Sequence, residues 1–338
     1  MKKRTVYYWS GFGVLFIIFI VSAIALLKYT PRKINILDLK GMEQNGYNNF
    51  IAGGTIAYAG EKLFYIDDKF IIGGLRQVSE GRDTYICKSP EKVYAYKDKL
   101  FCFYHIQDNR YRIKCIDTKT GIESDILSDV RYFAVAHDKI YYVSDSTGEL
   151  WRTDTSGKNS ENLGLRSVHL AVSEDCVIAY AQISGSQGGE QYITVFSEKS
   201  QIKKKLYGGY IGECLDLTNY KLAVNPDYMF DFSADEEEIY LERIKETAPH
   251  MLEEYRFQNA VNGMLYTCNA QAKNVLEPFS YKLVPTIEQN EETVGIWKRK
   301  IEEGECQRIS TVSLLEFSVF DTKSIYYIRY GYLYRIEI

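Results

Sequence analysis

The sequence predicts an all-β domain folded as a β-propeller, with one transmembrane helix in front of it. Three observations lead to this prediction: a strand-turn-strand stretch that recurs seven times, an abundance of tyrosine, and a long uncharged stretch near the N-terminus. The chain has 338 residues, 29 of them tyrosine. Tyrosine favours the pleated, half-buried surfaces of strands, and this length suits one large all-β domain or two ordinary ones.

The uncharged stretch runs from Val6 to Leu27. As a helix it would be about 33 Å long, and the hydrocarbon core of a bilayer is about 30 Å thick. Basic residues occupy positions 2–4, which predicts that the N-terminus stays in the cytoplasm and the rest lies outside. The alternative is secretion after signal-peptide cleavage, because Ala23-Ile24-Ala25 has the small-residue pattern of a cleavage site.

These features divide the chain into four parts. Residues 1–5 are the expected cytoplasmic tail, and 6–27 the transmembrane signal anchor. Residues 28–44 are the expected juxtamembrane linker, and 45–338 the extracytoplasmic propeller. The partner of residues 6–27 is then the membrane itself.

The recurring stretch predicts the propeller. Each copy has two apolar strands joined by a tight turn of Asp, Gly, Asn or Pro, residues that tolerate the backbone angles of such turns. Separations of about 35–60 residues are near the period of propeller blades. Seven copies predict seven blades, and six and eight stay as alternatives because the copy at Gln258 is weak. The copies begin at Thr55, Lys92, Tyr132, His169, Lys221, Gln258 and Glu316.

Each strand of the repeat has its own residue pattern. Small residues recur in the first strand, as at Ala57 and Ala134, and suit the crowded axis of a propeller. Bulky pairs in the second strand, such as Phe64 and Tyr65, are expected to fill the space between blades. A third strand carries an aromatic residue followed by a basic one, as at Trp151. We expect these aromatic residues in the core between blades, with a sugar-stacking platform as the alternative.

The last copy ends after its third strand, so the last blade would lack an outer strand. An unpaired edge invites pairing with another strand. We therefore expect an early segment, Asn35–Leu39 or Asn48–Ile51, to supply the missing strand and lock the ring.

Two stretches carry a resemblance to a known family. Asn45–Asp67 resembles the opening of a bacterial propeller domain of unknown function, which is similar to the propeller of low-density-lipoprotein-receptor-related proteins. Asp138–Asn159, with its "TDTSG" turn, resembles the repeat of that domain. The resemblance covers most of residues 45–338. It implies a β-propeller in secreted or membrane-tethered proteins of Gram-positive bacteria, and it brings no catalytic motif.

Charge is distributed unevenly. The chain has a net charge of −4, but its first 33 residues hold six of the 41 basic residues and none of the 45 acidic ones, which leaves a net charge of −10 for the rest. A domain this acidic lacks the basic surface by which proteins bind nucleic acid. We therefore expect no nucleic-acid partner.

No motif in the sequence assigns a catalytic residue, a cofactor or a metal. The four histidines have no metal-binding spacing, and the nucleophile motif G-x-S-x-G is absent. The densest acidic run, Asp235–Glu238, does not by itself supply the six or more converging oxygens that calcium needs.

One pair of the seven cysteines is a candidate disulfide. If Asp108-Asn109 is a two-residue turn, Cys102 and Cys115 face each other across the hairpin at a non-hydrogen-bonded site, where side chains approach closest. The alternative is two free thiols.

The sequence thus favours a membrane-anchored binding or interaction module over an enzyme. A protein or a cell-wall glycan is the expected partner, at the loops Ser184–Glu190 and Asn269–Glu292, because rigid scaffolds present function on loops. The alternatives are an extracytoplasmic enzyme that acts on cell-envelope glycan and a structural subunit of an envelope complex.

Overall fold

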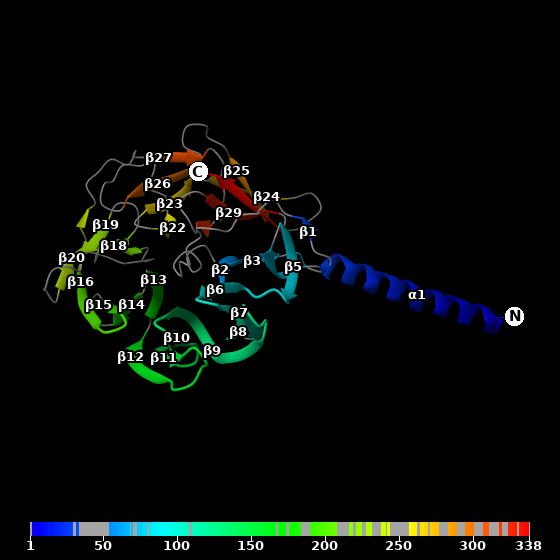
Figure 1. Ribbon diagram of the computed structural model, residues 1–338, viewed down its shortest axis with the longest axis horizontal. Helices are drawn as coiled ribbons and strands as arrows, with labels where there is room; N and C mark the ends of the chain where they lie inside the picture. Colours follow the sequence, from blue (N-terminus) through cyan, green and yellow to red (C-terminus); the bar gives the residue numbers. More distant parts are fainter. Residues whose placement is uncertain are drawn as a thin grey trace.

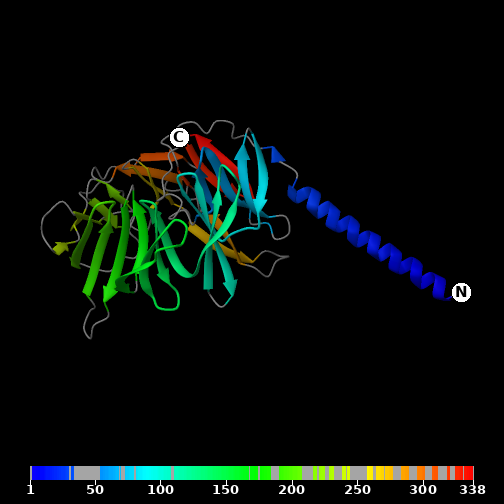
Figure 2. The same ribbon diagram turned by 60° about the horizontal axis from the view of Figure 1, so that its bottom comes forward.

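The computed structural model describes residues 2–29, 32–33 and 54–207, apart from breaks at 68, 70–72, 80, 108–109, 167, 174–175 and 184–189, and beyond residue 207 the strands named below. Its sheets, antiparallel apart from the pairing of β16 with β20, stand around a common axis, so the domain is a β-propeller (Figure 1). Helix α1 (Lys2–Tyr29) precedes the ring and projects from its rim (Figure 2).

The first half of the ring has three sheets. The first blade has the strand order β1-β5-β4-β3-β2. Its strands are β1 (Arg32–Lys33), β2 (Ile56–Ala59), β3 (Lys62–Asp67), β4 (Gly74–Ser79) and β5 (Arg82–Cys87). A seven-stranded sheet follows, formed by β6 (Lys92–Tyr96), β7 (Lys99–Gln107), β8 (Arg110–Asp117), β9 (Glu123–Ala136), β10 (Lys139–Ser144), β11 (Glu149–Asp154) and β12 (Glu161–Arg166). The third sheet has β13 (Val168–Ser173), β14 (Cys176–Ile183), β15 (Glu190–Phe196), β16 (Gln201–Tyr207) and β20 (Glu238–Tyr240).

Four further sheets complete the described strands. One has β17 (Asp216–Thr218), β18 (Lys221–Val224), β19 (Tyr228–Asp231) and β21 (Glu242–Arg243). The next has β22 (Phe257–Val261), β23 (Met264–Asn269), β26 (Gly295–Lys300) and β27 (Gln307–Ser310), and beside it in sequence lies the hairpin β24 (Gln271–Leu276) and β25 (Leu283–Glu288). The last sheet has β28 (Ser318–Val319), β29 (Ser324–Arg329) and β30 (Tyr332–Glu337).

All seven copies of the recurring stretch form antiparallel hairpins, as the sequence predicted. The pairs are β2–β3, β6–β7, β9–β10, β13–β14, β18–β19, β22–β23 and β28–β29. The number of blades stays a prediction, because one sheet contains two of the hairpins and the pair β24–β25 lies outside the repeat.

Strand β9 joins two blades. Its first half pairs with β8 up to Val130, and its second half pairs with β10, with Val130 opposite Ser144 and Tyr132 opposite Val143. Asp129, directly before Val130, has a left-handed backbone with a φ of 63°. The second blade is therefore β6–β8 with the first half of β9, and the third blade is the second half of β9 with β10–β12.

The core lies between neighbouring sheets. Ala57 and Ala134, in the first strands of their blades, are fully buried. Phe64 packs in a cluster with residues of the second blade, and the adjacent Tyr65 packs in a different cluster with residues of the last sheet. Because successive side chains of a strand point to opposite faces, one bulky pair fills two inter-blade spaces, as the sequence predicted.

The first blade and the last sheet meet directly. Tyr326 and Leu333 of the last sheet share a buried cluster with Ile56 and Tyr65. The segments 35–39 and 48–51, which we expected to close the ring, lie outside the described residues. Among the residues that are described, an early segment pairs elsewhere: β1 adds to the outer edge of β5 in the first blade.

Helix α1 has 28 residues, and its described side chains begin at Gly13. Large apolar side chains on it are 40–70% exposed: Val14, Leu15, Phe16, Ile17, Ile18, Phe19, Ile20, Val21, Leu26 and Leu27. Among the described residues, no helix combines the length and the hydropathy that crossing a membrane requires. The transmembrane span at residues 6–27 stays a prediction.

Closure of the ring can be tested at Gly331, which has a φ of 71°. A Cβ atom there would lie 2.2 Å from Oδ1 of Asp67 in the first blade. We expect Gly331→Ala to lower the free energy of unfolding by about 1–2 kcal/mol for the left-handed backbone and by a further ~1–3 kcal/mol for overpacking. Urea denaturation of the full chain in detergent measures this.

Gly121→Ala is the matched control. Gly121 has nearly the same φ, 72°, and its Cβ would meet nothing within 4 Å. Gly121→Ala should therefore lower the free energy of unfolding only by the backbone contribution. Equal losses for the two variants would contradict the close contact between the last sheet and the first blade.

Candidate functional surfaces of the ring

The loops of the propeller lie on two faces. Because the strands of a blade run up and down in turn, the connections alternate between the two ends of the sheet. The turn face carries the turns between first and second strands, at residues 60–61, 97–98 and 137–138 in the first three blades. The crossover face carries the loops between second and third strands, such as residues 145–148, and the links between blades, such as Asp129.

Tight turns of similar geometry line the turn face. Gly60 and Glu61 have φ values of 55° and 59°, and His137 and Asp138 have values of 51° and 56°. Two successive residues with positive φ are typical of the turns that match the twist of a hairpin. The repeated turn therefore brings equivalent residues of successive blades to equivalent places.

Lysines at one position of the repeat link successive blades across this face. Lys62 Nζ donates a hydrogen bond to the carbonyl oxygen of Thr118 at 2.5 Å, and Lys99 Nζ donates to Thr155 Oγ1 at 2.9 Å. Both lysines start the second strand of one blade, and both acceptors follow the third strand of the next. The recurring lysine is visible in the sequence, but its link to the next blade was not predicted.

Ion pairs also form at this surface, one between blades and one within the second blade. Lys97 Nζ lies 2.6 Å from Asp138 Oδ2 in the next blade, and Lys119 Nζ lies 2.5 Å from Asp98 Oδ2. The hydrogen bond that Lys97 donates to Asp138 raises the pKa of Lys97. Both members of the Lys97–Asp138 pair are more than half exposed, so the pair stabilises the fold by about 0–1 kcal/mol. The charged groups named here therefore pair with other side chains of the propeller.

The "TDTSG" turn of the third blade is organised around Asp154. Its Oδ1 accepts hydrogen bonds from the Ser156 hydroxyl at 2.6 Å and from the backbone N–H groups of Ser156 and Lys158 at 2.9 Å. Its Oδ2 accepts one from the Asn159 side chain. These bonds, the Ser156 hydroxyl first, lower the pKa of Asp154. The motif that carries the family resemblance therefore shapes a loop.

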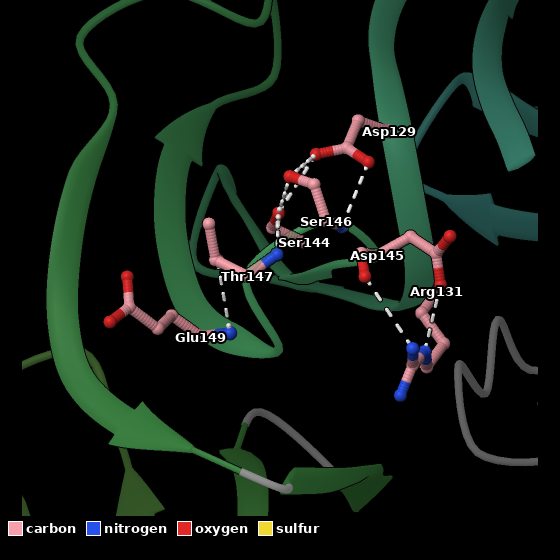
Figure 3. Close-up of polar contacts among 7 residues, drawn as sticks. All are labelled: Asp129, Arg131, Ser144, Asp145, Ser146, Thr147 and Glu149. Atoms are coloured by element: carbon pink, nitrogen blue, oxygen red, sulfur yellow. Dashed lines mark hydrogen bonds and ion pairs between the residues drawn. The ribbon is translucent and has the colours of Figure 1, made fainter.

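The crossover face has a comparable cluster around Asp129 (Figure 3). Asp129 Oδ2 accepts hydrogen bonds from the hydroxyls of Ser144 at 2.8 Å and Ser146 at 2.6 Å, and Oδ1 accepts one from the Ser146 backbone at 3.0 Å. Next to it, Arg131 Nε donates to Asp145 Oδ1 at 2.9 Å. The carboxylate of Asp129 thus holds the loop that follows β10 against the link between two blades.

This cluster can present the Arg131 guanidinium to a binding partner. Both oxygens of Asp129 already accept hydrogen bonds, and no histidine hydrogen-bonds Ser144 or Ser146 within the described part of the chain. Arg131 is 50% exposed and held in place by Asp145. A guanidinium fixed in this way can donate hydrogen bonds to a carboxylate or to the oxygens of sugar hydroxyls.

The carboxylate of Glu149, at the start of β11, is also hydrogen-bonded within the protein. It accepts hydrogen bonds from Arg166 at 2.7 Å and from Asn162 at 2.8 Å. Arg166 first, then Asn162, lowers the pKa of Glu149. This carboxylate therefore stays ionised and is not set up as a general acid at neutral pH.

The described residues hold no group of three or more His, Cys, Asp or Glu side chains that could bind a metal ion. His105 packs edge-on against Tyr111, with ring centroids 5.1 Å apart. His137 lies in a turn. The side chain of His169 and all of His250 lie outside the described residues, as do residues 235–237 of the acidic run.

The predicted pairing of Cys102 with Cys115 is corrected by the strand register. Cys102 lies opposite Lys114, and Cys115 lies opposite Phe101, because a β-bulge between His105 and Gln107 shifts the register by one residue. The two side chains therefore point to opposite faces of the sheet and pack in different clusters. Both are free thiols, which was the alternative.

Burial also makes these thiols poor nucleophiles. Desolvation raises the pKa of Cys115 to about 11 and the pKa of Cys102 well above its usual value. Desolvation likewise raises the pKa of Cys87. Because the thiolate is the reactive form, the three side chains are protonated at neutral pH.

The predicted contact loops have different outcomes. Of Ser184–Glu190, only Glu190 is described, as the first residue of β15. The long loop predicted at Asn269–Glu292 is wrong, because β24 and β25 form an antiparallel hairpin within it.

The aromatic residues of the third strands mostly serve the core. Trp151 packs against a buried cluster, and Tyr111 stacks on Phe103 with centroids 4.5 Å apart. Tyr334 differs: it is 40% exposed, and it stacks on Tyr327 at 5.2 Å. Tyr332, two residues earlier on β30, is 41% exposed. Lys69 Nζ lies 3.9 Å from the centre of the Tyr332 ring. These two tyrosines form an aromatic surface on the last sheet, and each ring has one neighbour on the protein.

The chain matches no known protein-family model and no curated protein by sequence. Solved structures resemble it in fold. The β-propeller domain of the Trilobed protease from Pyrococcus furiosus is 12% identical, with 80% of this chain and 86% of that chain covered and a TM-score of 0.46. The Pyrococcus horikoshii acylaminoacyl peptidase is 11% identical over 88% of this chain and 53% of that chain, with a TM-score of 0.48.

An oligogalacturonate lyase in complex with manganese is 11% identical, over 63% of this chain and 72% of that chain, with a TM-score of 0.44. At these values the similarity says nothing about what this chain binds. The assignment of the fold rests on the sheets described above.

The Asp154 turn predicts a pH dependence of stability. Its folded-state pKa is lowered, so its stabilising contribution is present above the unfolded pKa of about 3.9 and is lost as the pH falls through the folded pKa. We expect Asp154→Asn to unfold at lower urea concentration than wild type at pH 7, with the difference narrowing below about pH 4.

Asp125→Asn is the control for this experiment. The Asp125 carboxylate is 76% exposed, and its ion pair with Lys114 is long, at 3.9 Å. The control should change the midpoint little at any pH. A constant difference between Asp154→Asn and wild type across the pH range would contradict the role of the ionised carboxylate.

Proposed function

We propose that this chain is a membrane-anchored binding module that holds its propeller outside the cytoplasm. The observation that carries the proposal is α1, which stands clear of the ring with its apolar side chains exposed (Figure 1). Contiguous exposed apolar surface on a protruding helix marks a membrane or partner contact. The uncharged residues 6–27 have about the length of a bilayer's hydrocarbon core.

The proposed orientation follows from charge. Basic residues at positions 2–4 favour a cytoplasmic N-terminus, which puts the propeller outside. The resemblance of residues 45–67 to the propeller domain of Gram-positive surface proteins agrees with this placement. In the alternative of cleavage after Ala25, the propeller is secreted.

The proposed partner is a protein or a cell-wall glycan. Support comes from the rigid ring and from two sets of exposed groups on it. Arg131 is held in place on the crossover face by Asp145. Tyr332 and Tyr334 lie on the same side of β30 because they are two residues apart. Flat aromatic surfaces of this kind stack on sugar rings, so a glycan suits the second set.

Anchoring and orientation can be measured in intact cells that express the full chain with a C-terminal tag. We expect the protein in the membrane fraction after alkaline carbonate washing, and we expect external protease to remove the mass beyond residue 34. Retention of the tag under protease would place the propeller inside. Release by carbonate would contradict the anchor, and a mature N-terminus near residue 26 would favour the secreted form.

The binding role predicts an effect of the exposed tyrosines. Tyr332→Ala/Tyr334→Ala should weaken binding of the detergent-solubilised protein to purified cell-wall glycan about tenfold or more, since buried aromatic contacts often carry most of a binding energy. Ile122→Ala, which removes an apolar side chain 67% exposed after β8, on the turn face, is the control. Equal binding by both variants would contradict a glycan site on β30, and pull-down of a protein by the wild type would assign the partner to the other class.

A further inference from the structure

The C-terminal end of α1, here called its root, contacts the first blade. Strand β1, which follows the helix, pairs with β5 so that Arg32 lies opposite Asp83 and Lys33 lies opposite Arg82. Arg76 of β4 donates a hydrogen bond from Nη1 to the backbone carbonyl of Lys28 at 3.3 Å. A cation at this place satisfies a carbonyl at the end of the helix and favours the negative end of the helix dipole.

The group that holds the helix is buried and paired. Arg76 and Asp83 have side chains that are 1% and 0% exposed, and Nη2 of the first lies 2.9 Å from Oδ1 of the second. The Tyr65 hydroxyl donates a further hydrogen bond to Asp83. A buried pair of charges resists separation, because each charge is costly to leave alone. The joint between α1 and the blade is therefore fixed in direction.

This joint sets the height of β5 above the proposed bilayer. Lys28 directly follows Leu27, the last residue of the uncharged stretch. Its Nζ lies 4.4 Å from the centre of the Tyr85 ring on β5. The headgroup layer on each side of a bilayer is roughly 5–8 Å thick. If residues 6–27 fill the hydrocarbon core, β5 lies at the level of the headgroups, where tyrosine and lysine are favoured.

The exposed charges described around the joint are basic. Lys28, Arg82 and Lys88 have no acidic partner among the described residues, and Arg82 and Lys88 are exposed. The residues beyond 33 have a net charge of −10, so this basic rim differs in charge from the rest of the propeller.

We propose that the rim of the first blade at the root of α1, with Lys28, Arg82 and Lys88, binds the headgroups of anionic phospholipids. This inference rests on the proposed membrane anchor and goes beyond it, since an anchor alone requires no contact between the propeller and the lipid. The exposed Ile86, which lies between Arg82 and Lys88 in the sequence, adds apolar surface next to the cations.

The contact determines how the propeller is presented. In both views α1 leaves the ring from its rim beside β5 (Figures 1 and 2). A ring held by its rim stands edge-on to the membrane, so the turn face and the crossover face both stay open to partners. The acidic remainder of the domain is then repelled by the anionic surface, which favours the same orientation.

The test uses the full chain in lipid nanodiscs made of phosphatidylcholine with increasing fractions of phosphatidylglycerol. Hydrogen–deuterium exchange of peptides that cover residues 82–88 reports the contact. We expect exchange to slow as phosphatidylglycerol is added. In Arg82→Gln/Lys88→Gln, half-maximal protection should need about 25 times more anionic lipid, about fivefold for each cation removed.

The control is Lys158→Gln/Lys199→Gln, which removes the same charge from two exposed positions, one in the turn after β11 and one between β15 and β16, and should leave the titration unchanged. Protection of residues 82–88 that is equal in neutral and anionic nanodiscs would overturn the inference while leaving the anchor intact. Protection by inorganic phosphate in neutral nanodiscs would assign the surface to a soluble anion and overturn it as well. Failure of the chain to enter nanodiscs would instead contradict the anchor.

Discussion

The structure depends on one constraint: a sheet of this sequence has two apolar faces and can bury both only between two neighbouring sheets. Phe64 and Tyr65 show this at one point of β3, since the two adjacent side chains enter different inter-blade clusters and are almost fully buried. Each buried side chain of this size contributes about 1.5–3 kcal/mol. A sheet at the end of an open stack would lose half of that burial, so the sheets form a ring in which the last meets the first.

The same constraint explains how much of the fold could be predicted from the sequence. All seven hairpins follow from local alternation of side chains and from turn residues, which are visible in a short window. The error at Cys102 and Cys115 came from a bulge of one residue between His105 and Gln107. No residue type in this turn requires that bulge, and one residue of shift moves a side chain to the other face of the sheet.

Contacts between distant segments could not be predicted in this way. Strand β1 has two residues and pairs with a strand about fifty positions later, so no local pattern identifies it. Hairpin β24–β25 lies outside the recurring stretch, so the repeat did not predict it and we expected a loop there. The lysines that link blades were visible as a repeated residue, but their role depends on acceptors in the next blade, as with Lys62 and Thr118. The loop cluster at Asp129 likewise depends on a serine-containing loop fifteen residues away.

The first blade combines closure of the ring with attachment of the helix, and Tyr65 belongs to both. Its ring packs in the cluster that contains Tyr326 of the last sheet, and its hydroxyl donates to Asp83. Asp83 in turn pairs with Arg76, which donates to the end of α1. Buried contacts therefore run from the last sheet to Arg76, and a partly buried hydrogen bond continues from Arg76 to the end of the helix. Because a polar group is costly to leave unpaired in a dry interior, a displacement of the last sheet against the first blade would disturb the contacts that hold α1.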